Sequence, residues 1–116
     1  MKPLKRYCKT LELVDNPDLI AEYKRHHVPG AVWPEITQGV KSVGIREMEI
    51  YISGTTLFMI VETAADFDHD IAMKHLADLP RQSEWESLMS KYQKSDPASS
   101  AKDKWRIMER IFTLNP

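Results

Sequence analysis

Hydrophobic and polar residues along the 116-residue chain follow two periods, one typical of strands and one typical of helices. Alternation over short runs predicts strands at residues 5–14, 45–53, 56–63 and 105–114. The first strand places Tyr7, Lys9, Leu11 and Leu13 on one face. The third strand is apolar on both faces, as expected in the middle of a sheet. A turn at Gly54-Thr55 joins the second strand to the third as a hairpin.

Two helical regions, each divided in two, lie between these strands. Helical spacing predicts segments at residues 17–27, 34–44, 66–79 and 82–92. Asn16 is a typical N-cap with Pro17 at the first helical position, and Pro29-Gly30 ends the same helix. The resulting order, β-α-β-β-α-β, predicts a ferredoxin-like α+β fold with helices on one face of an antiparallel sheet.

One polar stretch interrupts this pattern, at residues 93–104, which read QKSDPASSAKDK. Small, polar and charged residues in such a run predict a long exposed loop. The chain is apolar again from Trp105, so the loop lies inside one domain that spans residues 1–116. Simple burial of Trp105 in the core is expected over a role as a dimer contact.

The amino-acid composition and net charge argue against several classes of function. The net charge of −1, with 42% hydrophobic and 28% charged residues, is that of an ordinary globular domain and argues against nucleic-acid binding. The chain has no apolar run of membrane-spanning length and no secretory signal near its start, so we expect a cytoplasmic protein without membrane contact. A single cysteine, Cys8, excludes an internal disulfide and reads as a core residue.

The sheet face without helices must be exposed to solvent, bind a ligand or pack on a second subunit. Its predicted side chains are mixed in character: Glu47, Glu49, Tyr51 and Glu62. They suit a partly enclosed polar cavity, which the packing of two sheets in a homodimer would create. This is a hypothesis that light scattering on the purified protein tests.

The segment EYKRHHVPGAVWPE, residues 22–35, concentrates the residues suited to chemistry. Tyr23 and His27 lie one helical turn apart and can act on the same ligand. Histidine suits general acid or base catalysis near neutral pH, and an aromatic ring suits the C–H face of a sugar. The structural alternative is that Tyr23 packs in the core and that His27 interacts with the helix C-terminus.

At this point the chain resembles the L-rhamnose mutarotase family. The matching residues are Tyr23-x-x-x-His27, a following proline, Trp33-Pro34-Glu35, Glu49-Ile50-Tyr51, residues 57–62, Gln82-x-x-Trp85 and Leu88-Met89. The resemblance implies a dimeric α/β barrel of ferredoxin-like subunits. It also implies an isomerase that interconverts the α and β anomers of a 6-deoxyhexose sugar without a cofactor or a metal.

Individual residues carry over from this resemblance. His27 matches the catalytic histidine, a proton donor, and Tyr23 and Trp85 match sugar-binding residues. We also expect Tyr51, Trp33, Glu35 and Glu84 at the substrate. The chain departs from the family at Glu84, where a tryptophan is usual, at Met48, where a tyrosine is usual, and by two residues inserted after His27. These departures make L-fucose a rival to L-rhamnose.

Mutarotation needs one acid and one base within hydrogen-bond reach of the sugar. His27 fills one role, and the second group is left open among Glu49, Glu62 and Glu35. Two other function classes share this fold: a cofactor-free monooxygenase, which predicts an apolar cavity, and a non-enzymatic ligand-binding module. A metal site in residues 66–75 is disfavoured, since His69 and His75 are six residues apart and do not share a helical face.

Overall fold

The sheet of the computed structural model, which describes residues 4–96 and 99–115, has four strands. They are β1 (Leu4–Glu12), β2 (Ile45–Ser53), β3 (Thr56–Ala64) and β4 (Arg106–Met108), in the order β2-β3-β1-β4. Every neighbouring pair is antiparallel. This order confirms the ferredoxin-like arrangement that the sequence predicts.

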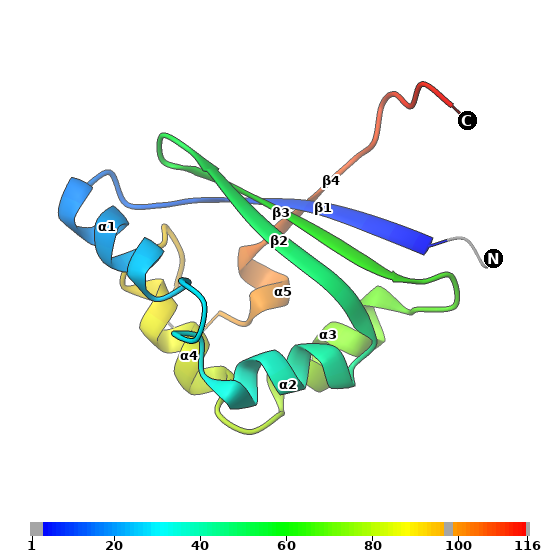
Figure 1. Cartoon of the computed structure of the whole chain (residues 1–116), viewed down its shortest axis with the longest axis horizontal. Helices are drawn as coiled ribbons and strands as arrows, with labels where there is room; N and C mark the ends of the chain where they lie inside the picture. Colours follow the sequence, from blue (N-terminus) through cyan, green and yellow to red (C-terminus); the bar gives the residue numbers. More distant parts are fainter. Residues whose placement is uncertain (1–3, 97–98, 116) are drawn as a thin grey trace.

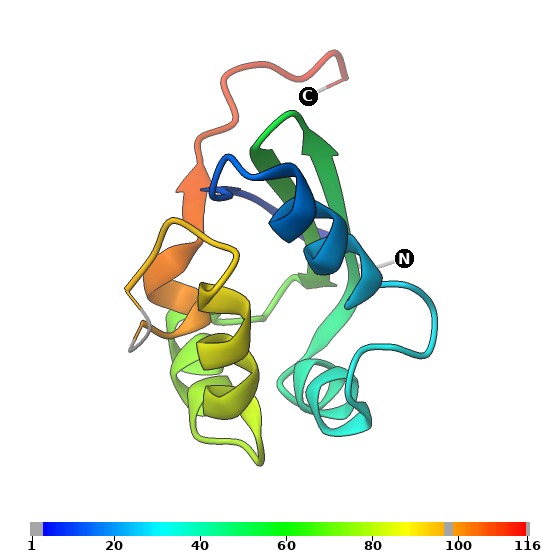
Figure 2. The ribbon, with the colours of Figure 1, turned by 90° about the vertical axis from the view of Figure 1, so that its left-hand side faces the viewer.

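The helices lie on one side of the sheet (Figures 1 and 2). Their bounds are α1 (Pro17–Arg25), α2 (Pro34–Ser42), α3 (His69–Ala77), α4 (Gln82–Ser90) and α5 (Ala101–Lys104). The Asn16 side chain accepts hydrogen bonds from the backbone N–H groups of Asp18 and Leu19, as expected of an N-cap. No helix of the described residues is long and apolar enough to cross a membrane.

Strand alternation divides the sheet into two faces with different roles. Lys9 pairs with Met59 and Leu11 with Leu57, and all four side chains are buried beneath the helices. Cys8 belongs to the alternate set and faces away from the helices. The core therefore lies between one sheet face and the helical layer, and the other face is left without helices (Figure 1).

The predicted loop at 93–104 is exposed only in part. Gln93 and Lys104, at its two ends, are 4% and 5% exposed, and residues 101–104 form α5. The backbone of Gln93 bridges to Leu13, which ties the start of the segment to the end of β1. The expectation of an exposed loop is wrong at both ends, because polar side chains there find buried partners. Residues 97 and 98 lie outside the described residues.

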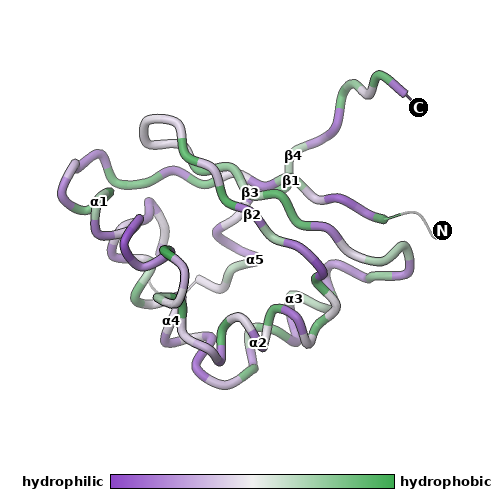
Figure 3. The backbone as a smooth tube through the Cα atoms, viewed as in Figure 1, coloured by the Kyte–Doolittle hydropathy of each residue, from purple (hydrophilic) through white to green (hydrophobic). Residues whose placement is uncertain are grey.

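The last strand is shorter than predicted. Pairing with β1 covers only Arg106, Ile107 and Met108, where residues 105–114 were expected to form a strand. Beyond Met108 the chain leaves the sheet and extends away from the body (Figure 1). The apolar residues there, Ile111, Phe112 and Leu114, are exposed and appear as green segments of the tube in Figure 3. Trp105 itself is buried in the core, as expected.

Candidate active site

A cavity of about 570 Å³ lies between the covered face of the sheet and the helices. Its walls are mostly apolar, with Val32, Ile36, Val40, Ile50, Met59, Val61 and Met89 among them. The buried or half-buried polar residues among its lining are Lys9, Tyr23, His27, Gln82, Glu86 and Gln93, and exposed polar residues line it as well: Thr37, Lys41, Arg46 and Glu47. The cavity therefore offers an apolar surface together with a small set of polar groups.

His27 is held in one orientation beside two aromatic rings. Its Nδ1 lies 2.7 Å from the carbonyl oxygen of Tyr23, at the end of α1. Because a carbonyl can only accept, Nδ1 carries the proton and the neutral ring keeps its lone pair on Nε2. The ring centroids of Tyr23 and Trp85 lie 4.5 and 5.8 Å from that of His27.

The charge state of His27 follows from its surroundings. Burial lowers the pKa of the imidazole below its usual 6.5, the hydrogen bond to the Tyr23 carbonyl opposes this, and the neighbouring His26 adds to it. The ring is therefore neutral at pH 7, and its Nε2 is a proton acceptor.

Tyr23 is buried, and its hydroxyl is fixed by a chain of polar side chains. Gln93 Nε2 donates to the hydroxyl oxygen at 3.3 Å, and Gln93 Oε1 accepts from Lys104 Nζ at 3.0 Å. Since an ammonium only donates, it fixes the orientation of the Gln93 amide, so the Tyr23 oxygen is an acceptor there and its own proton is available to a ligand. Burial raises the pKa of Tyr23 to about 12, which keeps this proton in place.

Lys104 is the centre of that polar chain. Its Nζ lies 3.0 Å from Glu86 Oε1 and donates to the Glu86 carbonyl oxygen at 2.6 Å, in addition to Gln93. The other carboxylate oxygen of Glu86 accepts from Gln82 Nε2 at 2.7 Å. All three ammonium donors thus have partners, which is the condition for a stable buried charge.

Lys9 is buried in a different way. The residue is 2% exposed and lines the cavity, yet its ammonium makes no hydrogen bond or ion pair with any residue in 4–96 or 99–115. Burial lowers the pKa of Lys9 to about 8, although the charge of Asp70 opposes the shift. The ammonium therefore brings free hydrogen-bond donors into the cavity.

Trp33, Glu35 and Glu84 gather around Arg81, beside the cavity. The Trp33 ring lies 5.2 Å from that of Trp85, with the Arg81 guanidinium 3.9 Å above its centre. Arg81 is within 3.4 Å of a Glu35 oxygen and 3.6 Å of a Glu84 oxygen. Neither glutamate lines the cavity, so the structure does not bring these two predicted site residues to the histidine.

Tyr51 lies on the far side of the sheet from His27. Its neighbour Ile50 lines the cavity, so strand alternation turns Tyr51 outward, where its hydroxyl donates to Glu49 at 3.0 Å. Glu62 is on the same outer face, within 3.8 Å of Arg6. The expected polar cavity on this face is therefore not the one that contains His27, and neither Glu49 nor Glu62 is placed as its partner.

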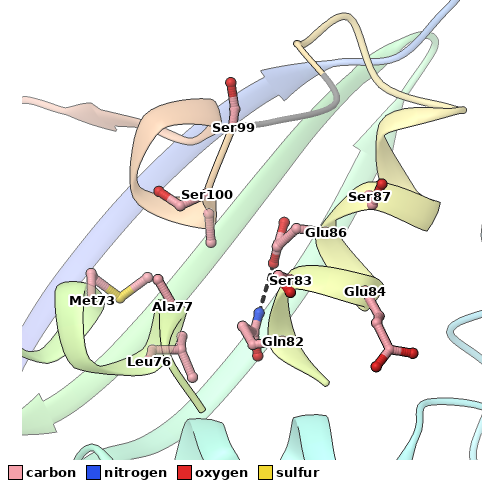
Figure 4. Close-up of a pocket in the computed structure, with 11 residues that line it drawn as sticks. Met73, Leu76, Ala77, Gln82, Ser83, Glu84, Glu86, Ser87, Ser99 and Ser100 are labelled. Carbon is pink, nitrogen blue, oxygen red and sulfur yellow. Dashed lines mark hydrogen bonds between the residues drawn. The ribbon is translucent and has the colours of Figure 1, made fainter. Parts of the chain in front are cut away.

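A second cavity of about 530 Å³ adjoins the first, between α3, α4 and residues 99–101. Glu86 and Gln82, joined by their hydrogen bond, line both cavities (Figure 4). Four serines give the second cavity a polar wall: Ser83, Ser87, Ser99 and Ser100. Among the described residues, no group of three His, Cys, Asp or Glu side chains could hold a metal ion.

Four polar residues of the site were missed at the level of sequence: Lys9, Glu86, Gln93 and Lys104. Lys9 did leave a signal, because a lysine among Tyr7, Leu11 and Leu13 occupies an inward position of a strand. Gln93 and Lys104 left none, because they lie in a stretch whose composition is that of an exposed loop.

Comparison with known proteins identifies the family. The family model for L-rhamnose mutarotase matches residues 6–114. An L-fucose mutarotase of Xanthomonas campestris is 40% identical over 112 residues, which cover 97% of this chain and 90% of the relative. The chain belongs to the L-rhamnose mutarotase family. A UPF0734 protein of Dictyostelium discoideum is 38% identical over 115 residues, 96% of this chain and 90% of that protein.

Solved structures support the same fold. An L-rhamnose mutarotase of Formosa agariphila superposes with a TM-score of 0.71 at 22% identity, over 96% of this chain and 99% of the other. Tetracenomycin F2 cyclase of Streptomyces glaucescens, a type-II polyketide cyclase, gives 0.57 at 14% identity, over 94% and 97%. The second likeness concerns the fold alone. Mutarotases are isomerases that interconvert sugar anomers, and the family favours this function over the monooxygenase and the binding module.

Proposed function

We propose that this mutarotase acts on a 6-deoxyhexose, with L-fucose and L-rhamnose as the two candidates. The observation that carries the proposal is that a neutral His27 and the Tyr23 side chain line the same cavity. The relative at 40% identity, an L-fucose mutarotase, supports L-fucose, and the matching family model supports L-rhamnose.

The cavity suits such a sugar in shape and polarity. A 6-deoxyhexose has a methyl group where other hexoses have a hydroxymethyl group, and the methionine and aliphatic walls suit that methyl group. The Trp85 ring offers a face to the C–H groups of the pyranose ring. Polar side chains at the cavity then orient the hydroxyl groups.

The reaction requires two proton transfers in each direction. In ring opening, His27 Nε2 takes the proton of the anomeric hydroxyl while an acid protonates the ring oxygen, and the bond between C1 and that oxygen breaks to leave an aldehyde. Rotation about C1–C2 presents the other face of the aldehyde. In ring closure the ring oxygen attacks C1, the acid recovers its proton, and His27 donates its proton to the new anomeric oxygen. His27 is a proton donor in this second half.

The test is two-dimensional proton exchange NMR on the anomeric signals of L-fucose and L-rhamnose, with and without protein. Protein-dependent exchange peaks for one sugar support the proposal and name the substrate. His27→Gln should lower the exchange rate by about 100-fold or more. His75→Gln, at an exposed histidine of α3, is the matched control and should retain the rate. No exchange with either sugar contradicts the proposal.

We also propose that the protein acts in the cytoplasm as a homodimer. Support for the dimer comes from exposed apolar residues at the sheet and beyond its end: Tyr51, Ile107, Met108, Ile111, Phe112 and Leu114. Light scattering should give twice the 13.4 kDa chain mass, and a monomer at micromolar concentration contradicts the dimer.

A further inference from the structure

The polar groups of the cavity differ in how far they are already engaged. Gln93, Glu86 and Gln82 are bonded to one another or to Lys104, and His27 Nδ1 is bonded to the Tyr23 carbonyl. The Lys9 ammonium has no hydrogen-bond partner in the described part of the chain, and the residue is 2% exposed. Lys41, Arg46 and Glu47 have no such partner either, but these three residues are exposed, which leaves Lys9 as the buried one among them. Its ammonium can bind an acceptor in the cavity.

Within residues 4–96 and 99–115, the acid whose charge acts on Lys9, Asp70, and the buried acid of its cavity, Glu86, are bound to other cations. Asp70 acts on the Lys9 charge, but its oxygen Oδ1 lies 3.0 Å from His69 Nδ1 and 3.9 Å from Lys102 Nζ. Glu86 is bound to Lys104. A methionine at position 9 would fill the same space without the cost of an unpaired charge. A residue that lowers stability in this way is typical of a functional site.

We propose that Lys9 is the second catalytic residue of the mutarotase, and that its Nζ donates a proton to the ring oxygen of the sugar. The proposal rests on the proposed function and completes it. The ammonium gives its proton to the ring oxygen as the bond to C1 breaks, and the neutral amine takes the proton back when the ring closes. With His27 as the partner at the anomeric hydroxyl, all protons and electron pairs are accounted for, and no further reactant is needed.

This assignment replaces the three glutamates among which sequence reasoning left the second role open. Glu35 is bound to Arg81 beside the cavity, and Glu49 and Glu62 lie on the outer face of the sheet. Lys9 projects from the covered face of β1, opposite Met59, and lines the same cavity as His27. Tyr23 also brings a proton to this cavity, but the pKa of its hydroxyl is raised to about 12, whereas that of Lys9 is lowered to about 8, so Lys9 is the stronger acid.

The charge states of the two residues are compatible with these roles. A pKa of about 8 for Lys9, set mainly by burial, keeps the ammonium charged at pH 7, where the lowered pKa of His27 leaves that ring neutral. Other titratable groups line this space or act on it, so the pH profile is compared with that of a control variant that keeps all of them. Tyr23 on α1, Lys41 on α2, Arg46 and Glu47 on β2 and Glu86 on α4 line it, the charge of Asp70 on α3 acts on Lys9, and Lys104 on α5 pairs with Glu86.

The experiment compares wild type with Lys9→Met and Lys9→Arg by anomeric exchange NMR between pH 6 and 9, with the uncatalysed rate subtracted. Lys9→Met should lower the exchange rate at pH 7 by about 100-fold. The wild-type rate should fall as pH rises past 8. Lys9→Arg should retain only the part of the rate that a hydrogen bond to the ring oxygen supplies, without that fall, because a guanidinium stays protonated and does not give up its proton. Lys74→Met, at an exposed lysine of α3, is the control and should match wild type.

The possible outcomes distinguish a failure of the proposed function from a failure of the role of Lys9. An inactive wild type contradicts the proposed function itself, before Lys9 is tested. An active wild type with a Lys9→Met rate within twofold of it overturns the role of Lys9. If Lys9→Met does not fold, the profile of Lys9→Arg decides: a fall in rate near pH 8, as in wild type, overturns the proposal, and its loss supports it.

Discussion

Among the described residues two lysines are buried, Lys9 and Lys104, and they differ in their hydrogen-bond partners. Lys104 donates to the Glu86 carbonyl and to Gln93 Oε1 and forms an ion pair with the Glu86 carboxylate. Lys9 has no such partner in residues 4–96 and 99–115, and its pKa is lowered by burial to about 8. Lys104 is a paired charge that stabilises the fold, whereas Lys9 is an unpaired charge that we propose acts on a ligand.

The two regions are nevertheless connected. The polar chain from Lys104 passes through Gln93 to the Tyr23 hydroxyl, at the cavity that Lys9 lines. The structural charge therefore sets the direction of one hydrogen-bond donor in the site, at a distance from the substrate. Lys104 thus orients the Gln93 amide toward the Tyr23 hydroxyl, whereas Lys9 is the proposed catalytic residue.

The largest effect is expected from Lys104→Met. It leaves the Glu86 carboxylate buried without its cation and the Gln93 oxygen without a donor. Loss of one partner of a buried pair costs about 3–5 kcal/mol. Urea unfolding followed by circular dichroism measures the change. The double variant Lys104→Met/Glu86→Gln should recover part of the loss, and no recovery contradicts the assignment to an uncompensated charge.

Lys9→Met should have the opposite sign and raise the free energy of unfolding. The lowering of the Lys9 pKa from 10.5 to about 8 corresponds to a penalty on the order of 3 kcal/mol at neutral pH. The variant should therefore be about 1–3 kcal/mol more stable than wild type at pH 7 in the same urea experiment. A clear loss of stability would mean that the ammonium has a structural partner after all.

The pH dependence sharpens the same test. Between about pH 8 and 10.5 the unfolded chain holds a proton on Lys9 that the folded chain has released, so wild-type stability rises with pH through this window. The advantage of Lys9→Met should therefore be full below pH 8 and shrink toward pH 10.5. A constant difference across this range contradicts the lowered pKa.

Tyr23→Phe should have the smallest effect on stability. It removes the acceptor for Gln93 Nε2 at 3.3 Å and leaves the aromatic packing on His27 and Tyr92 in place. A loss of about 1 kcal/mol is expected. The anomeric exchange rate should fall about tenfold, the equivalent of one hydrogen bond in the transition state. An unchanged rate would show that the Tyr23 hydroxyl, the last group of the polar chain from Lys104, makes no hydrogen bond to the substrate.

Local signals in the sequence were sufficient for most of the fold. The cap at Asn16, the turn at Gly54 and the alternation in residues 47–53 depend on neighbours in the chain, and the structure has all three; between Ile45 and Glu47 the register shifts, which the sequence pattern did not predict. The last strand was overestimated because its length depends on what β1 offers to pair with, which is Cys8 to Thr10 only. Apolar residues beyond that point resemble a strand but have no neighbour in the sheet.

The site was only partly predictable, for a related reason. Tyr23, His27 and Trp85 all line the cavity: helical spacing brought Tyr23 and His27 together, and the family resemblance added Trp85. Tyr23 also packs in the core and His27 also bonds a carbonyl at the end of α1, as the structural alternative has it. The position of other candidate residues depends on the face of the sheet that they occupy, since alternation places Tyr51 outside and Met48 inside. Whether a lysine such as Lys9 has a partner depends on distant segments, and sequence spacing contains no such information.

Strand β1 carries two adjacent residues, Cys8 and Lys9, that can serve as spectroscopic probes of opposite faces of the sheet. Lys9 faces the cavity that we propose binds the sugar, and the adjacent Cys8, the only cysteine in the chain, faces the side of the sheet that has no helices. A fluorophore or a nitroxide attached to this one thiol needs no prior mutagenesis. Its signal would follow subunit association from the outer face, while isotope labels on the lysine ammonium follow sugar binding from the inner face.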